Sequence, residues 1–193
     1  MLYITSFSTT EKSHDREHAA GKLLLSCAVK EEYGFPVLPE IDKREYGKPY
    51  FPEYENVHFN ISHTGNMAVC ALGETELGVD IERIRPVKEA MQNRVLTERE
   101  REWLLQKSDM AEAFIRLWTL KESYIKATGQ GLRTELSSIE FTIRETSEGE
   151  EIVCSREGFY FWQKKIGSTS YLALCMQGKK IPQEMKKLHI VFL

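Results

Sequence analysis

Two short runs of the sequence carry carboxylates and lysines that could bind a metal ion together with phosphate groups. One run is Gly78-Val79-Asp80-Ile81-Glu82, and the other is Leu117-Trp118-Thr119-Leu120-Lys121-Glu122-Ser123-Tyr124-Ile125-Lys126. Mg²⁺ prefers oxygen ligands and commonly takes a few protein carboxylates together with the phosphate oxygens of a substrate. The residue types therefore indicate a site for a divalent cation and a polyphosphate, provided that the fold brings the two runs together.

The first run lies in a segment, residues 76–82, that reads as a strand. Side chains alternate across a strand, so Asp80 and Glu82 would share one face while the apolar side chains between them face the core. Two neighbouring carboxylates repel each other unless a cation or water screens them. Such acid pairs are common, and for this triplet alone two solvated acids on an exposed strand are the simpler interpretation.

The second run lies in the strongest predicted helix, residues 109–128. Lys121 falls within the apolar arc of this helix, which is a costly position for an ammonium unless an anion faces it or its stem reaches water. Glu122 lies at the edge of the arc, and Lys126 lies one turn beyond it. A surface salt bridge between Glu122 and Lys126 is the simpler alternative. Because that alternative does not explain Lys121, we favour a cleft.

Weaker candidates lie elsewhere in the chain. Ser62 and His63 follow a predicted strand, where they and nearby amides could hold a phosphate, although a turn with a satisfied histidine is the simpler interpretation. Lys48 occupies a stiff Gly47-Lys48-Pro49 turn and could offer its charge to a phosphate. A small basic group precedes the first predicted helix and comprises Lys12, His14 and Arg16.

Glu100 has two competing interpretations. The run Thr97-Glu98-Arg99-Glu100 fits a capping box, in which the Glu100 side chain would bond back to the backbone of Thr97. Glu100 could instead point into the cleft and act as a general base. The spacing alone favours the cap.

The bulk properties are those of an ordinary globular protein. A chain of 193 residues with 41% hydrophobic residues can form one large domain or two small fused ones. Its net charge of −3 gives no indication of nucleic-acid binding, and it has no run of eighteen apolar residues and no signal peptide. The four cysteines lack metal-site spacing, so we expect reduced, buried thiols and a cytoplasmic location.

The predicted elements fall into two α+β halves of similar size, residues 1–84 and 85–193. We expect a strand at 2–7, a helix at 14–33 with Gly34 as its stop, and strands at 57–61, 66–72 and 76–82. In the first helix, Ala20, Leu23, Leu24, Cys27 and Ala28 recur at helical spacing. We then expect helices at 86–95, 97–106 and 109–128, the last capped by Asp109, followed by strands at about 137–143, 151–154, 158–163, 169–176 and 188–192.

The order of these motifs resembles the surfactin-synthetase-activating (Sfp-like) class of 4′-phosphopantetheinyl transferases. The resemblance rests on Gly47-Lys48-Pro49, Phe59-Asn60-Ile61-Ser62-His63, Gly78-Val79-Asp80-Ile81-Glu82, Trp118-Thr119-Leu120-Lys121-Glu122-Ser123 with Lys126, and Gly129-Gln130-Gly131-Leu132. It implies two similar α/β halves packed as an intramolecular pseudo-dimer, with coenzyme A bound between them. It also implies a monomer that moves 4′-phosphopantetheine from coenzyme A to a serine of an apo acyl or peptidyl carrier protein, releasing adenosine 3′,5′-bisphosphate.

The resemblance also implies roles for individual residues. Asp80, Glu82 and Glu122 correspond to magnesium ligands, Lys48, Ser62 and His63 to coenzyme A contacts, and Lys121 and Lys126 to lysines that face the diphosphate. Lys126 would stabilise or protonate the leaving phosphate, and Glu100 corresponds to a proposed general base. Arg83, Arg85 and Lys88 could help to dock an acidic carrier. Two alternatives are a non-catalytic module that binds coenzyme A or a carrier protein, and an unrelated Mg²⁺-dependent phosphoesterase.

Overall fold

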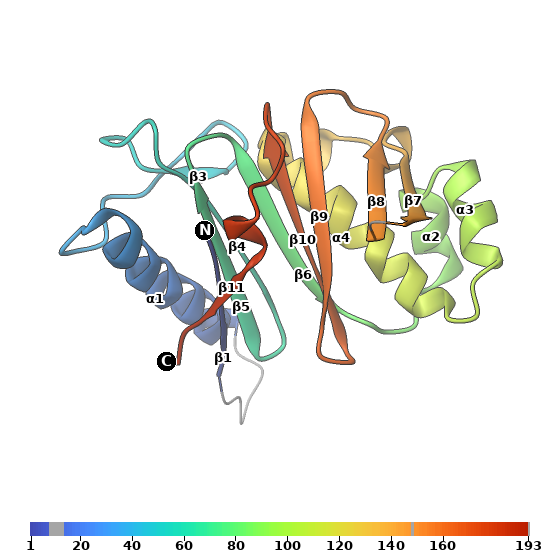
Figure 1. Ribbon diagram of the computed structural model, residues 1–193, viewed down its shortest axis with the longest axis horizontal. Helices are drawn as coiled ribbons and strands as arrows, with labels where there is room; N and C mark the ends of the chain where they lie inside the picture. The colour runs from blue at the N-terminus through green and yellow to red at the C-terminus, as the bar shows by residue number, and fades with distance from the viewer. Residues whose placement is uncertain (8–13, 148, 193) are drawn as a thin grey trace.

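The computed structural model describes residues 1–7, 14–147 and 149–192 (Figure 1). Two main sheets lie side by side, with the helix α1 at one end of the molecule and the helices α2 and α3 with the hairpin β7–β8 at the other. The predicted α+β class is confirmed, and the predicted helices and strands are found with their ends shifted by a few residues.

The first sheet has the strand order β11-β1-β5-β4 and is covered by α1. The strands are β1 (Leu2–Ser6), β4 (His58–Thr64), β5 (Met67–Gly73) and β11 (Leu188–Ile190), and α1 spans His14–Tyr33. Neighbouring strands are antiparallel except for β11, which pairs with β1 in parallel. The end of the chain therefore returns to the N-terminal sheet. The predicted boundary between residues 84 and 85 stays a prediction.

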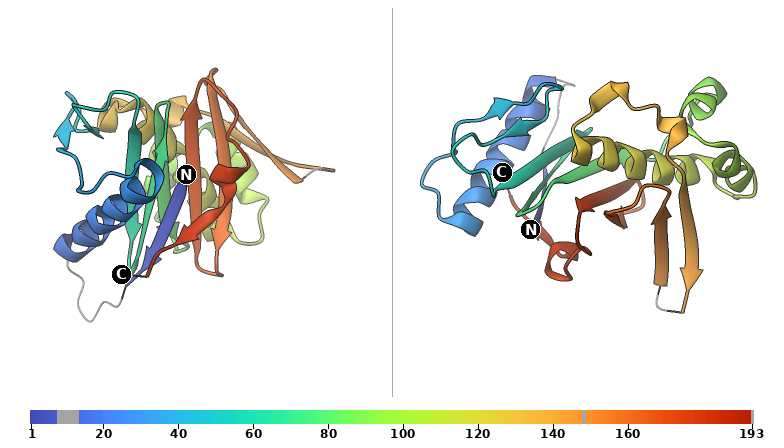
Figure 2. Two further views of the ribbon diagram at one scale, coloured as in Figure 1. Left: turned by 60° about the vertical axis from the view of Figure 1, so that its left-hand side comes forward. Right: turned by 90° about the horizontal axis from the view of Figure 1, so that it is seen from above.

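The second sheet has the order β6-β10-β9, and the helix α4 packs along β6 and β10. Its strands are β6 (Leu77–Arg83), β9 (Phe159–Ile166) and β10 (Ser170–Gln177), and α4 spans Met110–Thr128. The view from above in Figure 2 shows α4 running beside β6 near the middle of the molecule. This places the two sequence runs that carry the acids on adjacent elements.

Shorter elements complete the fold. The helices α2 (Glu89–Val95) and α3 (Glu98–Leu105) precede α4, and the hairpins are β2 (Asp42–Lys43) with β3 (Pro49–Tyr50) and β7 (Phe141–Thr146) with β8 (Gly149–Cys154). Three 3₁₀ helices span Gly131–Arg133, Leu136–Ser138 and Glu184–Lys186. Every helix in the described ranges is too short or too polar to cross a lipid bilayer.

The predicted apolar face of α1 is wrong by about one residue. Leu23 is 56% exposed and Cys27 is exposed, whereas Leu24, Leu25, Ala28 and Val29 are buried against the first sheet. The run of three leucines at 23–25 explains the error, because apolar periodicity does not choose between overlapping stripes. All four cysteines are free thiols, as predicted. Cys70 and Cys175 are buried, whereas Cys154 is only partly buried and Cys27 is exposed, so the prediction of burial is wrong for these two.

Gly78 allows α4 to approach β6 closely. A Cβ atom at this position would lie 2.1 Å from the carbonyl oxygen of Ser123 and 2.3 Å from the amide nitrogen of Ala127, both in the α4 backbone. We expect Gly78→Ala to lower the free energy of unfolding by about 3 kcal/mol, because overpacking against backbone cannot be relieved by a rotamer change. Urea denaturation measures the loss.

Gly73→Ala is a matched control. There the nearest atom to an added Cβ is the Cδ2 of Leu77 at 2.9 Å, the end of a flexible side chain. Its loss of stability should be clearly smaller than that of Gly78→Ala. Equal midpoints for Gly78→Ala and the parent protein would show that α4 and β6 are not in close contact.

Candidate active site

The two main sheets meet along β4 and β6, where polar side chains of β4 form hydrogen bonds with the backbone of β6. The two strands belong to different sheets. The amide of Val79 donates to Oδ1 of Asn60 at 2.8 Å, and the amide of Ile81 donates to Oγ of Ser62 at 3.3 Å. We call Asn60, Ser62 and Thr64, which alternate along β4, the polar seam. The polar seam holds β6 beside β4 through the backbone amides of β6. The carboxylates of Asp80 and Glu82 are not needed for this pairing of the two strands.

Asp80 is the most buried of the three candidate acids, with 5% of its surface exposed. Its Oδ1 accepts hydrogen bonds from Ser62 Oγ at 2.9 Å and from Lys126 Nζ at 2.6 Å. Its Oδ2 is buried and has no hydrogen-bond partner within the described part of the chain. A buried carboxylate oxygen without a partner is costly, and a bound cation would satisfy it.

The other two candidate acids lie on two elements: Glu82 on β6, two residues after Asp80, and Glu122 on α4. Glu82 Oε1 accepts a hydrogen bond from Thr64 Oγ1 at 2.9 Å, and Glu122 lies in α4, which packs along β6. Burial raises the pKa of Glu122, the charge of Asp80 raises it further, Lys126 opposes this, and Glu82 adds a smaller increase. Glu122 therefore interacts electrostatically with both acids of β6. Their joint role as metal ligands stays a prediction.

Lys126 connects the helix to the strand. It lies one turn after Glu122 on α4, and its Nζ donates to Asp80 and, at 2.9 Å, to Ser62 Oγ. The side chain is 26% exposed, so its ammonium lies at the edge of solvent. An i,i+4 pair on one helix face thus places a carboxylate and a cation beside the acids of β6.

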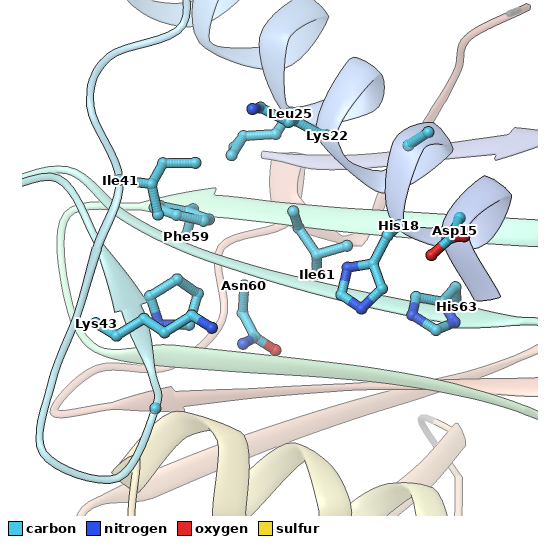
Figure 3. Close-up of a pocket in the computed structure, with 13 residues that line it drawn as sticks. Asp15, His18, Lys22, Leu25, Ile41, Lys43, Phe59, Asn60, Ile61 and His63 are labelled. Atoms are coloured by element: carbon cyan, nitrogen blue, oxygen red, sulfur yellow. The ribbon is translucent and has the colours of Figure 1, made fainter.

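One cavity of about 610 Å³ opens beside the polar seam (Figure 3). Its labelled side chains come from α1, β4 and the segment around β2, and they include apolar walls with cations at the margin. The polar lining includes His18, Lys22, Lys43, Asn60 and His63. The rings of His18 and His63 meet edge-to-face at 5.4 Å, and Nδ1 of His63 lies 3.1 Å from a carboxylate oxygen of Glu17. Such a cavity suits a planar ring that carries an anionic group.

A second cavity of about 610 Å³ opens beside α4. Glu122 and Lys126 form one part of its lining. The remainder comes from the end of α2 and from the segment 131–137, which contributes Arg133, Leu136 and Ser137. A long ligand with a polyphosphate in its middle could therefore occupy one cavity at each end and present its phosphates to the acids and Lys126.

Comparison with known proteins identifies the family. A sequence model described as the 4′-phosphopantetheinyl transferase superfamily matches residues 76–175. These residues are slightly more than half of the 193 in the chain, and they contain β6, α4 and nearly all of β10. The chain belongs to the 4′-phosphopantetheinyl transferase superfamily.

Two relatives agree with this assignment in sequence. 4′-Phosphopantetheinyl transferase Sfp of Bacillus subtilis is 29% identical over 80% of this chain and 65% of its own length. 4′-Phosphopantetheinyl transferase psf-1 of Bacillus pumilus is 36% identical over 70% of this chain and 58% of its own length. Among solved structures, the holo-[acyl-carrier-protein] synthase of Thermotoga maritima is 22% identical, with a TM-score of 0.44 over 54% of this chain and 64% of that one. The chain thus spans less than two thirds of these relatives.

The acids of this phosphopantetheinyl transferase family member fit a hard divalent cation by the chemistry of their oxygen atoms. Three carboxylates interact, and one buried oxygen of Asp80 has no hydrogen-bond partner in the described ranges. Within these ranges, however, no group of three or more His, Cys, Asp or Glu side chains is gathered closely enough to hold a metal as it stands. Binding a cation would therefore require side chains to move closer together.

Glu100 and Lys121 form a buried ion pair away from these acids. Lys121 is fully buried, Glu100 is 1% exposed, and Nζ lies 2.6 Å from Oε2. Oε2 also accepts from the amide of Thr97 at 2.8 Å, and Oε1 accepts from the amide of Phe141 at 2.8 Å. The capping box favoured by the spacing is confirmed. A general base at Glu100 stays a prediction, and it would require the carboxylate to leave these partners.

The predicted contact between Lys121 and a diphosphate would likewise require Lys121 to leave its partners in the structure. Nζ of Lys121 donates to the carbonyl oxygens of Val95 at 2.9 Å, Leu136 at 3.0 Å and Ile139 at 2.6 Å. Burial lowers the pKa of Lys121, and Glu100 opposes that shift. The anion that faces this lysine in the structure is therefore Glu100. Its contact with Leu136 also anchors the segment that lines the second cavity.

Lys48 is buried where the 44–49 segment meets β6 and α4. Its ammonium binds the carboxylate of Glu76 and donates to the carbonyl oxygens of Leu77 at 3.2 Å and Ala127 at 2.5 Å. An ammonium has three hydrogens, and these contacts take all of them. Burial lowers the pKa of Lys48, while Glu76 opposes the shift. In this arrangement Lys48 positions the neighbouring turn, and contact with coenzyme A would require it to exchange a partner.

Several cavity residues were missed by the sequence analysis. Lys22 lies in α1 and Lys43 in β2, and each lines the first cavity, whereas Arg16 is exposed and does not line it. Lys12 lies outside the described residues, as does the side chain of His14. Isolated lysines in an amphipathic helix or a short hairpin carry no distinctive spacing. The packing of α1 and of the β2–β3 hairpin beside β4 identifies them.

Proposed function

We propose that this chain transfers 4′-phosphopantetheine from coenzyme A to a serine of an apo acyl or peptidyl carrier protein. The observation that supports it best is the contact of Lys126 with Asp80, because Lys126 and Glu122 also line one of the two 610 Å³ cavities. The other cavity is lined by Asn60, which lies on β4 two residues before Ser62, the second partner of Asp80. Coenzyme A has a nucleotide at one end, a pantetheine arm at the other and a diphosphate between them. Two of the relatives named above, Sfp and psf-1, are phosphopantetheinyl transferases by name.

The nucleotide would occupy the first cavity and the pantetheine arm the second. The apolar walls around Phe59 and Ile61 suit the adenine ring, and Lys22 and Lys43 would supply cations for the 3′-phosphate. His63 lines the same cavity and would supply a ring N–H donor. The second cavity combines apolar and polar lining, as a chain with two amide groups requires. The diphosphate would then lie beside Lys126.

Asp80, Glu82 and Glu122 would hold Mg²⁺, which would neutralise part of the charge on the diphosphate oxygens. Lys126 would stabilise the charge that develops on the leaving phosphate, because its ammonium already lies at the edge of solvent beside Asp80. The serine oxygen would form a bond to the phosphorus that carries the pantetheine. The bond from that phosphorus to the bridging oxygen would break, releasing adenosine 3′,5′-bisphosphate, and the serine proton would pass to a base or to water.

The carrier protein would dock near the basic segment that follows β6. Arg85 and Lys88 are exposed there and could meet an acidic partner. The guanidinium of Arg83 instead donates to Oδ1 of Asn66 at 2.6 Å and packs over Gly65 in the β4–β5 turn. We therefore propose Arg85 and Lys88 as the docking cations, in a chain that acts as a cytoplasmic monomer.

Intact-mass analysis tests the function. The purified chain is incubated with coenzyme A, Mg²⁺ and a panel of apo acyl and peptidyl carriers, and a carrier should gain the mass of one phosphopantetheine group. EDTA should abolish the gain. Binding of coenzyme A without a mass gain on any carrier would contradict the transferase and favour a binding module. Release of phosphate from coenzyme A without a carrier would indicate a phosphoesterase.

A further inference from the structure

Thr64 contacts an acid of the site but has no role in the function described so far. It ends β4, is 9% exposed, and its Oγ1 donates to Oε1 of Glu82 at 2.9 Å. Oε1 of Glu82 also accepts a hydrogen bond from the backbone amide of Arg83 at 2.8 Å. Oε2 of Glu82 lies 3.7 Å from Nη2 of Arg85, whose side chain is 61% exposed. Two donors thus fix one oxygen of this carboxylate and leave the other oxygen for a ligand.

Ser62 acts on Asp80 in the same way. A hydroxyl has one hydrogen to donate and two lone pairs to accept with. The hydrogen of Ser62 goes to Asp80, and its lone pairs accept from the amide of Ile81 and from Lys126. The hydrogen-bonding capacity of this hydroxyl is used within the chain, so direct contact with coenzyme A would cost one of these bonds.

The spacing of the seam matches that of the acids. Ser62 and Thr64 are two residues apart on β4, and Asp80 and Glu82 are two residues apart on β6, so each hydroxyl faces one carboxylate. We propose that Ser62 and Thr64 are positioning residues whose hydrogen bonds restrict the rotation of Asp80 and Glu82 and so favour the binding of a divalent cation. This inference rests on the metal site of the proposed function.

Hydrogen bonds from neighbouring groups fix the orientation of ligand side chains, and their loss typically weakens metal binding by about 10–100-fold. Thr64→Val replaces the hydroxyl with a methyl group of similar size and leaves Glu82 with one donor fewer. We expect the dissociation constant for Mg²⁺ to rise by about tenfold or more in this variant. Thr64→Ser retains the hydroxyl and should bind Mg²⁺ nearly as the parent protein does.

Isothermal titration calorimetry of Mg²⁺ into the protein saturated with coenzyme A gives these constants directly. Thr5→Val is the matched control, because Thr5 lies in β1 and its buried Oγ1 has no hydrogen-bond partner within the described ranges. Its Mg²⁺ affinity should equal that of the parent. A general loss of folding is excluded by comparing the thermal unfolding of the three variants with that of the parent.

The outcomes separate this inference from the proposed function. Unchanged Mg²⁺ affinity in Thr64→Val, or no Mg²⁺ binding by the parent, overturns the inference. An equal loss in Thr64→Val and Thr64→Ser also overturns it, since the hydroxyl would then not be responsible. If the parent binds Mg²⁺ with the expected pattern across the variants but modifies no carrier, the inference stands and the transferase function fails.

Discussion

Asp80→Asn and Glu122→Gln are each expected to lower kcat/KM for carrier modification by about 10²–10³-fold. Both changes remove a negative charge and keep the shape of the side chain. Asp80 lies at the centre of the site, with one oxygen bound to Lys126 and Ser62 and the other buried without a partner in the described ranges. Glu122 interacts with it across the gap between α4 and β6. The rate of mass gain on a carrier that the parent modifies gives kcat/KM.

Glu122→Gln should lower activity without lowering the stability of the fold. Burial and the charge of Asp80 raise the pKa of this carboxyl, so its ionised form is disfavoured in the folded protein without metal. Glu122→Gln should therefore unfold at the same or a slightly higher urea concentration, measured in EDTA at neutral pH. Loss of activity with retained stability is the signature of a group kept for chemistry.

Glu112→Gln is the matched control on the same helix. Glu112 accepts a hydrogen bond from Tyr171 at 2.6 Å and pairs with Lys165 at 2.6 Å, outside the linings of the two 610 Å³ cavities. Its replacement should leave kcat/KM within a few-fold of the parent. If Asp80→Asn or Glu122→Gln retained full activity, that residue would be removed from the proposed metal site.

The sequence predicts α4 and its role well because the relevant signals are local. Asp109 accepts from the amide of Glu112 as an N-cap, and Gly129 ends the helix with φ of 68°. The alternation in β6 is likewise correct, since Val79 and Ile81 lie in the core while Gly78 faces α4. Local rules of capping and alternation are sufficient for these elements.

The partners of the buried polar groups could not be predicted in this way. Lys121 is found on the buried face, as the helical spacing requires. Its counter-ion comes from α3, and its carbonyl partners come from the end of α2 and from the segment 136–139. The contacts of Lys48 are also long-range, reaching Ala127 across 79 positions of the chain. Such pairings depend on how the helices and sheets pack, and no spacing in the sequence records that packing.

The second large effect is expected at the Glu100–Lys121 pair. Lys121→Met removes the charge and keeps most of the apolar stem, so Glu100 would be left buried without its cation. Breaking a buried ion pair by removing one partner costs about 3–5 kcal/mol. The three carbonyl oxygens that accept from Lys121 would lose a donor as well. We therefore expect a loss of about 4 kcal/mol in the free energy of unfolding, measured by urea denaturation.

Glu100→Gln distinguishes a structural role from catalysis by this residue. If the pair is structural, Glu100→Gln leaves Lys121 buried without a counter-ion, and it too should be strongly destabilised. The double variant Lys121→Met with Glu100→Gln should then recover part of the loss, because neither charge is buried alone. If Glu100→Gln is instead as stable as the parent but loses turnover, the carboxylate is needed for chemistry, as the predicted general base would be. Additive losses in the double variant would contradict the ion pair itself, because coupled residues in direct contact do not act independently.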